Sequence, residues 1–211
     1  LISMMLLMGV LLPSAARNRA QQVIAHRGYW KTEGSAQNSI SSLQNSYRIG
    51  VYGSEFDVHI TRDGVVVVFH DDDIQGIKIE NANFADIRDK VLADGETLPT
   101  LRQYLAAAKA LGSMKLILEV KEHIQKSDED RCIDACLQLV KEAGLDDRTE
   151  YISFSKYACD YLVKNAPGSK VSYLNGDLSP LDAKDAGYSG IDYEDKVFLK
   201  NPSWIGEARK L

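Results

Sequence analysis

Residues 55–71 decide the fold and read Glu55-Phe56-Asp57-Val58-His59-Ile60-Thr61-Arg62-Asp63-Gly64-Val65-Val66-Val67-Val68-Phe69-His70-Asp71. Two runs rich in β-branched and aromatic residues flank Asp63-Gly64, and this dipeptide between such runs predicts a two-residue hairpin turn. That turn would place Asp57 opposite His70, with Glu55 two residues away along the same strand. Residues that oppose each other, and residues two apart in one strand, point to the same side of a sheet. The three side chains are therefore predicted to share one face.

That shared face has two possible roles, which this stretch alone leaves equally open. Two carboxylates beside an imidazole suit the binding of a hard metal ion and the transfer of protons. The alternative is a hairpin face whose polar side chains simply point into solvent. The rest of the chain has to distinguish the two.

From Gln21 onward, strand-like and helix-like segments alternate, which favours βα units with a parallel sheet. The predicted strands are residues 22–26, 55–60, 115–121, 149–154, 170–174 and 190–193. The predicted helices cover 39–48, 101–111 and 155–166, with others beginning at Ser127, at Ser179-Pro180 and at Asn201-Pro202. Residues 73–98 show little periodicity and are predicted to form an insertion over one end of the fold.

Six such units could build an open doubly wound sheet or an incomplete (β/α)8 barrel. No glycine-rich phosphate-binding sequence follows any predicted strand, so a nucleotide-binding sheet is disfavoured. Polar residues near strand ends line the mouth of a TIM barrel, and several strands here end in that way. We therefore predict an α/β fold, a TIM (β/α)8-type barrel with a small insertion after its second strand. Its last two βα units are predicted to be absent from this chain.

The composition suits one globular domain, which we place at residues 21–211. The chain has 211 residues, of which 45% are hydrophobic and 26% are charged. Its net charge of -5 argues against a nucleic-acid partner and against an anionic membrane surface. An anionic substrate would therefore need a local cation in its binding site.

The first 20 residues have a different character from the rest. Residues 1–12 form an apolar run that is too short to span a bilayer, and Pro13-Ser14-Ala15-Ala16 follows it. This pattern predicts a secretory signal peptide, which is partial because no basic segment precedes the run. The expected product is exported, periplasmic or secreted, without stable membrane insertion after removal of the signal. The alternative is a buried N-terminal helix.

Taken as a set, several short motifs resemble the glycerophosphodiester phosphodiesterase family. They are His26-Arg27-Gly28, Asn38, Gly53-Ser54-Glu55-Phe56-Asp57-Val58, Thr61-Arg62-Asp63-Gly64, His70-Asp71 and Leu118-Glu119-Val120-Lys121. The resemblance implies an enzyme that hydrolyses small glycerophosphodiesters to sn-glycerol 3-phosphate and an alcohol. The attacking group, either a neighbouring glycerol hydroxyl or water, stays open.

The resemblance also implies a metal site and an acid–base pair. One divalent metal, Ca²⁺ or Mg²⁺, would be held by Glu55, Asp57 and Glu119, and such hard cations do prefer carboxylate oxygens. The general acid and base would be His26 and His70, since imidazole titrates near neutral pH.

Four further residues receive roles from the same resemblance. Arg27 and Lys121 would bind the substrate phosphate, and Asn38 and Asp71 would support the site. Asn38 is expected to order its loop or to cap the following helix. The chain departs from the family pattern at 36–38, where Ala-Gln-Asn replaces Pro-Glu-Asn, so a carboxylate is missing there.

Two other functions stay open at this point. A phosphoinositide- or sphingolipid-type phosphodiesterase could use the same fold, although the predicted insertion is rather polar for a lipid substrate. A non-catalytic exported module could bind polyol phosphates, although it would need neither histidine. His59 and His123 match no family position and are predicted to be polar residues at the rim of the barrel.

Overall fold

A computed structural model describes residues 22–211. The predicted signal peptide at residues 1–20 lies outside the described residues and stays a prediction. Among the helices of the described part of the chain, none combines the length and the apolar character that crossing a bilayer requires.

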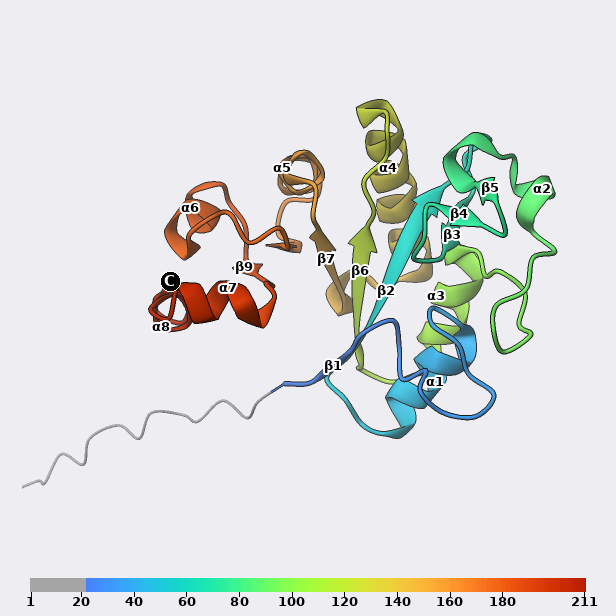
Figure 1. The fold of residues 1–211 in the computed structure, drawn as a ribbon, viewed down its shortest axis with the longest axis horizontal. Helices are drawn as coiled ribbons and strands as arrows, with labels where there is room; N and C mark the ends of the chain where they lie inside the picture. Colours follow the sequence, from blue (N-terminus) through green and yellow to red (C-terminus); the bar gives the residue numbers. More distant parts are fainter. Residues whose placement is uncertain (1–21) are drawn as a thin grey trace, which may run out of the picture.

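The centre of the fold is a sheet with strand order β1-β2-β6-β7-β8-β9 (Figure 1). Its strands are β1 (Ile24–Ala25), β2 (Gly53–Ile60), β6 (Lys115–Val120), β7 (Thr149–Ser153), β8 (Lys170–Tyr173) and β9 (Gly190–Ile191). All neighbours in this order pair in parallel, while β3 (Val66–Val68) pairs with β2 in the antiparallel sense. The sheet curls into part of a barrel with helices on its outside. The predicted α/β fold of an incomplete TIM barrel is confirmed.

Helices connect successive parallel strands, as right-handed crossovers require. They are α1 (Ile40–Arg48), α3 (Leu101–Lys109), α4 (Lys126–Ala143), α5 (Lys156–Asn165) and α6 (Pro180–Asp185), followed by α7 (Asp195–Lys200) and α8 (Trp204–Ala208). Hydroxyl side chains of Ser39, Thr100, Ser155 and Ser179 accept the backbone N–H groups that the helix starts leave unpaired. The predicted cap at Ser127 is wrong, because α4 begins one residue earlier, after Gln125. Helix α7 was not predicted.

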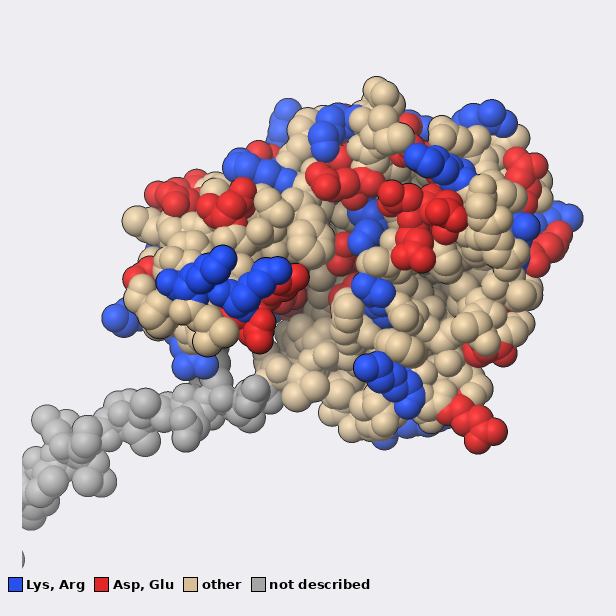
Figure 2. All heavy atoms as spheres, in the orientation of Figure 1, with Lys and Arg blue, Asp and Glu red and all other residues tan. Residues whose placement is uncertain are grey.

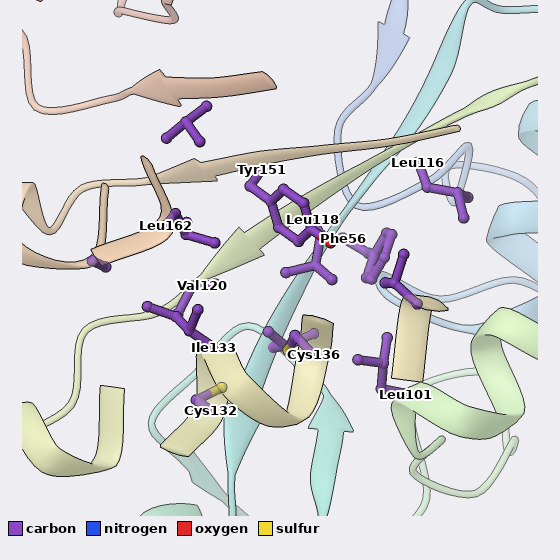
Figure 3. Close-up of a cluster of buried hydrophobic side chains, with 14 of the residues drawn as sticks. Phe56, Leu101, Leu116, Leu118, Val120, Cys132, Ile133, Cys136, Tyr151 and Leu162 are labelled. Atoms are coloured by element: carbon purple, nitrogen blue, oxygen red, sulfur yellow. The ribbon is translucent and has the colours of Figure 1, made fainter. Parts of the chain in front are cut away.

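The main hydrophobic core lies between the sheet and the helices. Figure 3 shows side chains of the strands meeting those of the helices, among them Phe56, Leu116, Leu118, Val120, Tyr151, Leu101, Cys132, Ile133, Cys136 and Leu162. Burial of each large apolar side chain contributes about 1.5–3 kcal/mol to folding. Because Phe56 and Val58 of β2 face this core, their neighbours Glu55 and Asp57 must point to the concave side of the sheet.

The hairpin between β2 and β3 differs from the predicted one by a single residue. His59 pairs with Val67, so the loop contains three residues, Arg62–Gly64, rather than two. Gly64 has a φ of +88°, a left-handed conformation that closes such a loop. The Thr61 hydroxyl holds this wider turn, since it accepts the Val65 N–H at 2.9 Å.

The longer loop changes which residue lies opposite Asp57. Phe69, not His70, donates its N–H to the Asp57 carbonyl at 3.0 Å. Strand β3 already ends at Val68, and His70 belongs to the loop that follows. The predicted pairing of Asp57 with His70 is therefore wrong.

The predicted insertion, residues 73–98, is built from very short elements, which explains its weak periodicity. They are β4 (Asp73–Ile74), β5 (Ile77–Lys78), the 3-10 helix η1 (Ile79–Asn81) and α2 (Phe84–Ile87). The segment has a small buried apolar cluster of its own that includes Ile74, Ile79, Ile87, Leu92 and Leu98.

Glu96 fastens this segment to the start of α1. Its two carboxylate oxygens accept the backbone N–H groups of Ile40 and Ser41, each at 3.1 Å. A carboxylate at a helix N-terminus also interacts favourably with the helix dipole.

Candidate functional site

Three carboxylates gather on the concave side of the sheet. Glu55 and Asp57 lie two apart on β2, and Asp57 lies opposite Glu119 of β6 in the parallel register. One carboxylate oxygen from each of the three lies within 4.8 Å of the others. The side chains are almost completely enclosed, since Glu55 is 4%, Asp57 0% and Glu119 5% exposed. Strand alternation and sheet register together produce this cluster.

Two cationic side chains accompany the carboxylates. The Nζ atom of Lys121 lies 3.0 Å from Glu119 Oε1 and 3.5 Å from Asp57 Oδ1. The Nε atom of Arg27 lies 3.7 Å from Asp57 Oδ2. Three carboxylates against two cations leave one negative charge in a buried place, where an uncompensated charge is costly.

Two oxygens in the cluster accept no hydrogen bond within the described part of the chain, although one of them, Asp57 Oδ1, lies 3.5 Å from Lys121 Nζ. Glu55 Oε1 and Asp57 Oδ1 are buried and accept no hydrogen bond from any described residue. Burial, together with the charge of Asp57, raises the pKa of Glu55 well above its ordinary value. Burial and Asp57 also raise the pKa of Glu119, although Lys121 opposes this. The donor set fits a hard divalent cation, which takes carboxylate oxygens as ligands and would compensate the remaining charge.

A strained turn after β1 presents Arg27 to these carboxylates. Arg27 and Gly28 have φ values of +57° and +76°, in the left-handed region. A Cβ atom at Gly28 would lie 2.3 Å from Ser42 Oγ, so only glycine fits there. The turn lets the Arg27 N–H donate to Glu55 Oε2 at 2.6 Å. Arg27 Nη1 donates to Gln37 Oε1 at 2.6 Å, and this bond holds the Arg27 side chain. No role was predicted for Gln37.

Asn38 contacts Asp57 directly. Its Nδ2 donates to Asp57 Oδ2 at 2.9 Å, and its Oδ1 accepts the Asp57 N–H at 3.1 Å. This pair of bonds fixes the orientation of the Asp57 carboxylate. Asn38 does not cap α1, because Ser39 does so. The expected capping role of Asn38 is therefore wrong, while its place beside the site is observed.

His26 and His70 lie beside the carboxylates on two separate loops. His26 follows β1, has a side chain that is 70% exposed, and places its Nε2 3.9 Å from Glu55 Oε2. Partial loss of hydration lowers the pKa of His26, and the charges of Arg27 and His70 act in the same direction. His70 accompanies Asp71, whose Oδ1 lies 2.6 Å from His70 Nδ1. The structure thus places His26 next to Glu55, and His70 is near enough for its charge to influence the pKa values of His26 and Glu119.

His59 and His123 are buried, so their predicted place at the rim is wrong. Burial lowers the pKa of His59 to about 4, so its ring is neutral at pH 7. Its Nε2 lies 3.2 Å from the His70 carbonyl oxygen and donates to it. His123 Nε2 in turn accepts the Ile60 N–H at 3.2 Å. The support that His59 gives to the His70 backbone was not predicted, although His59 lies two residues after Asp57 and therefore on the same face of β2.

The space-filling view shows the surface around these elements. In Figure 2 the face turned to the viewer is hollowed near its centre, and the wall of the hollow carries side chains of both charges. A small molecule with a charged group could enter from solvent at such a place.

Comparisons with known proteins agree with the motifs described above. A family model described as the glycerophosphoryl diester phosphodiesterase family matches residues 26–195. A glycerophosphodiester phosphodiesterase of Caldanaerobacter subterraneus subsp. tengcongensis is 28% identical over 168 residues, or 72% of this chain and 65% of that protein. A probable glycerophosphodiester phosphodiesterase 2 of Mycobacterium tuberculosis is 31% identical over 110 residues, or 50% of this chain and 40% of that protein. The chain thus spans less than two thirds of each of these curated relatives.

Solved structures include similar folds. A glycerophosphodiester phosphodiesterase from Parabacteroides distasonis is 49% identical, with a TM-score of 0.88, and the match covers 89% of this chain and 79% of that one. An Oleispira antarctica phosphodiesterase, solved in complex with the product sn-glycerol-3-phosphate, is 24% identical with a TM-score of 0.76. That match covers 89% of this chain and 81% of the other, and at this identity it supports the fold alone.

Proposed function

The chain belongs to the glycerophosphoryl diester phosphodiesterase family, and from this we propose that it hydrolyses small glycerophosphodiesters to sn-glycerol 3-phosphate and an alcohol. One observation carries the proposal. Buried oxygens of Glu55 and Asp57 accept no hydrogen bond from the described residues, and histidines from two different loops lie close to the cluster that these carboxylates form with Glu119. A purely structural cluster would have its buried oxygens paired.

We propose that Glu55, Asp57 and Glu119 hold one divalent cation, Ca²⁺ or Mg²⁺. Such a cation, when bound, neutralises charge on the phosphoryl oxygens. Asn38 supports this site, because its two hydrogen bonds hold the Asp57 carboxylate in one orientation. Residues that orient a ligand in this way typically matter 10–100-fold for metal affinity or activity.

Arg27 and Lys121 are proposed to bind the substrate phosphate. Arg27 is partly buried, and its Nε has no hydrogen-bond acceptor among the described residues. A phosphoryl oxygen would supply that acceptor, and a guanidinium can engage two oxygens at once. For Lys121, burial acts to lower the pKa, but the nearby charges of Glu119 and Asp57 outweigh it and raise the pKa. Lys121 therefore stays positively charged beside the phosphate.

His26 and His70 are proposed to transfer the protons of the reaction. A new phosphorus–oxygen bond forms to the attacking oxygen while the bond to the alcohol breaks. One histidine takes the proton from the attacking hydroxyl or water, and the other gives a proton to the departing alkoxide. Asp71 engages Nδ1 of His70, which leaves Nε2 for the transfer. If a glycerol hydroxyl attacks first, water then opens the cyclic phosphate, and the final products are the same.

The test is release of glycerol 3-phosphate from glycerophosphocholine by the purified chain. We expect release that stops with EDTA and returns when Ca²⁺ or Mg²⁺ is restored. Hydrolysis of no glycerophosphodiester by a folded protein that still binds the metal would contradict the proposal.

We also propose that the protein is exported, on the basis of the apolar run at residues 1–12 and the small residues after it. Expression of the chain in a bacterium, followed by fractionation and N-terminal mass analysis, tests this. Cleavage near residue 16 and recovery outside the cytoplasm are expected, whereas an uncleaved cytoplasmic product would contradict it.

A further inference from the structure

A second hollow adjoins the catalytic site on the side of His70. It has a volume of about 460 Å³ and lies between residues 30–38, residues 69–75 and residues 91–93. His70 and Asn38 are among its lining residues. Asn38 is bonded to Asp57, so this hollow adjoins the carboxylate cluster. Because Asn38 and His70 belong to both places, the hollow borders the position where the proposed substrate phosphate would lie.

The charge of this hollow is negative. Its lining includes Asp71 and Asp73, and none of the described residues that line it is a lysine or an arginine. Each carboxylate uses one oxygen in the protein: Asp71 Oδ1 contacts His70, and Asp73 Oδ1 accepts the Gly76 N–H at 3.0 Å. Their second oxygens have no such bond and are the free polar atoms that a ligand would meet. Two carboxylates, with Lys31 beside Trp30 as a nearby cation outside the lining, favour a cation over an anionic group.

Several of the polar side chains that line the hollow already make hydrogen bonds within the protein. Gln37 accepts from Arg27, Asn38 bonds to Asp57, and Ser35 accepts from Ser41 at 3.2 Å. A polyol placed there would find the free oxygens of Asp71 and Asp73 as acceptors, but few donors for its own hydroxyl oxygens, and hydroxyls that lose hydrogen bonds on burial are costly.

The remaining wall is apolar and partly aromatic. It includes Trp30, Phe69, Ile74 and Val91. Such a wall suits methyl groups, and aromatic rings attract ammonium groups through their negative faces. The ammonium group of Lys31 already lies over the Trp30 ring, with Nζ 5.3 Å from the ring centroid.

We propose that this hollow binds the alcohol part of the substrate and selects a methylated ammonium alcohol such as choline over a polyol such as inositol. The inference rests on the proposed function and adds to it the class of head group. Asp73 and Trp30 are the selecting residues, Asp73 through its free carboxylate oxygen and Trp30 through its ring.

The first test compares kcat/KM for glycerophosphocholine and glycerophosphoinositol. We expect the chain to prefer glycerophosphocholine by about tenfold, the combined effect of two cation contacts. Asp73→Asn keeps the shape and the turn to Gly76, and is expected to lower only the glycerophosphocholine value, by about two- to fivefold. Trp30→Leu is expected to act in the same direction. Equal values for both substrates in the parent chain, or equal losses in the variants, would overturn the inference while leaving the proposed function intact.

Asp89→Asn is the matched control. Asp89 lies on the same segment, pairs with Arg88 at the surface, and is not part of the lining. The variant removes the same charge, so it reports any effect of net charge alone. A fall in glycerophosphocholine hydrolysis equal to that of Asp73→Asn would overturn the assignment of Asp73.

A binding measurement keeps the inference separate from catalysis. The chain has two tryptophans, Trp30 and Trp204. In a Trp204→Phe variant, the tryptophan fluorescence therefore comes from Trp30 alone. Choline chloride is expected to change this fluorescence saturably, whereas sodium chloride and inositol at equal concentrations do not, and Asp73→Asn should weaken the response. If no diester is hydrolysed but this response is seen, the proposed function fails and the ammonium site stands. The absence of a response specific to choline would overturn the site.

Discussion

Two buried carboxylate sites in this molecule differ in how their oxygens are paired. Glu129 near the start of α4 is fully buried, as is Asp57 on the sheet. Glu129 Oε1 accepts from Lys126 Nζ at 2.6 Å and from the His123 N–H at 3.3 Å, and its Oε2 accepts from Ser155 Oγ at 2.7 Å. In the sheet cluster, by contrast, buried oxygens of Glu55 and Asp57 have no bond from the described residues.

The difference separates a structural carboxylate from a site prepared for a ligand. The protein itself satisfies Glu129, which ties the loops after β6 and β7 to α4. The sheet carboxylates are held in place, chiefly by Asn38 and Arg27, but are left short of positive charge. We therefore expect substitutions at Glu129 to cost stability, and substitutions in the sheet cluster to cost activity.

Asp57→Asn gives the largest expected effect. It removes one proposed metal ligand, whose cation supplies several kcal/mol of transition-state stabilisation, so glycerol 3-phosphate release should fall on the order of a thousandfold. The free energy of unfolding in urea without metal should change little, because relief of the repulsion among the three carboxylates offsets the loss of the contacts with Arg27 and Lys121. A stable variant with normal activity would remove the distinction between the two carboxylate sites.

His70→Asn should lower kcat by roughly a hundredfold or more, which is the usual contribution of a general acid or base. Because His70 is not a proposed ligand, the stabilisation of the protein by Ca²⁺ or Mg²⁺ should be unchanged. Kinetics and thermal unfolding with added metal measure the two properties separately. Loss of the metal effect in this variant would place His70 among the ligands instead.

Metal addition should raise the thermal midpoint of the parent chain. At a free metal concentration 100 times Kd the expected stabilisation is about 2.7 kcal/mol. Calorimetry with EDTA and then with excess Ca²⁺ or Mg²⁺ measures it. Glu119→Gln should abolish or strongly reduce the shift, whereas Glu129→Gln should retain it. A shift retained in the first variant and lost in the second would reverse our assignment of the two sites.

Glu129→Gln should destabilise the fold by about 2 kcal/mol, because it weakens hydrogen bonds from buried partners. The expected loss of stability is modest because Lys126 is half exposed, and solvent weakens its ion pair with Glu129. Urea unfolding measures the loss, and the activity of the folded fraction should stay within about threefold of the parent. A much larger loss of activity per folded molecule would connect Glu129 to the chemistry.

The barrel and its carboxylates could be predicted because both depend on local alternation. The period of two in 55–60 and in 115–121 places Phe56 and Leu118 on the side opposite Asp57 and Glu119. Parallel register then brings the acidic residues of neighbouring strands together. The structure brings these residues together, and their chemical roles stay proposals.

Other features depend on contacts that no local pattern contains. The extra residue in the hairpin follows from the Thr61 hydroxyl, so His70 reaches the site from a loop rather than from a strand. Asn38 finds its partner 19 residues away in the chain. His59 is in phase with the site but is buried, and its ring packs edge-on against that of His123 from the end of another strand. For Asn38 and His59 a tertiary contact overrides a reasonable local expectation, whereas the hairpin differs from its prediction through a bond within the turn itself.

The two hydrogen bonds that join Glu96 to the start of α1 matter for protein engineering. The carboxylate reaches backbone groups 55 and 56 positions earlier, so residues 73–98 and the loop that carries Gln37 and Asn38 share one anchor. A chimaera that receives this segment from a relative without a carboxylate at that point would release the start of α1. The wall that we propose for the head group therefore cannot be transplanted by itself, and a graft has to include both Glu96 and the start of α1.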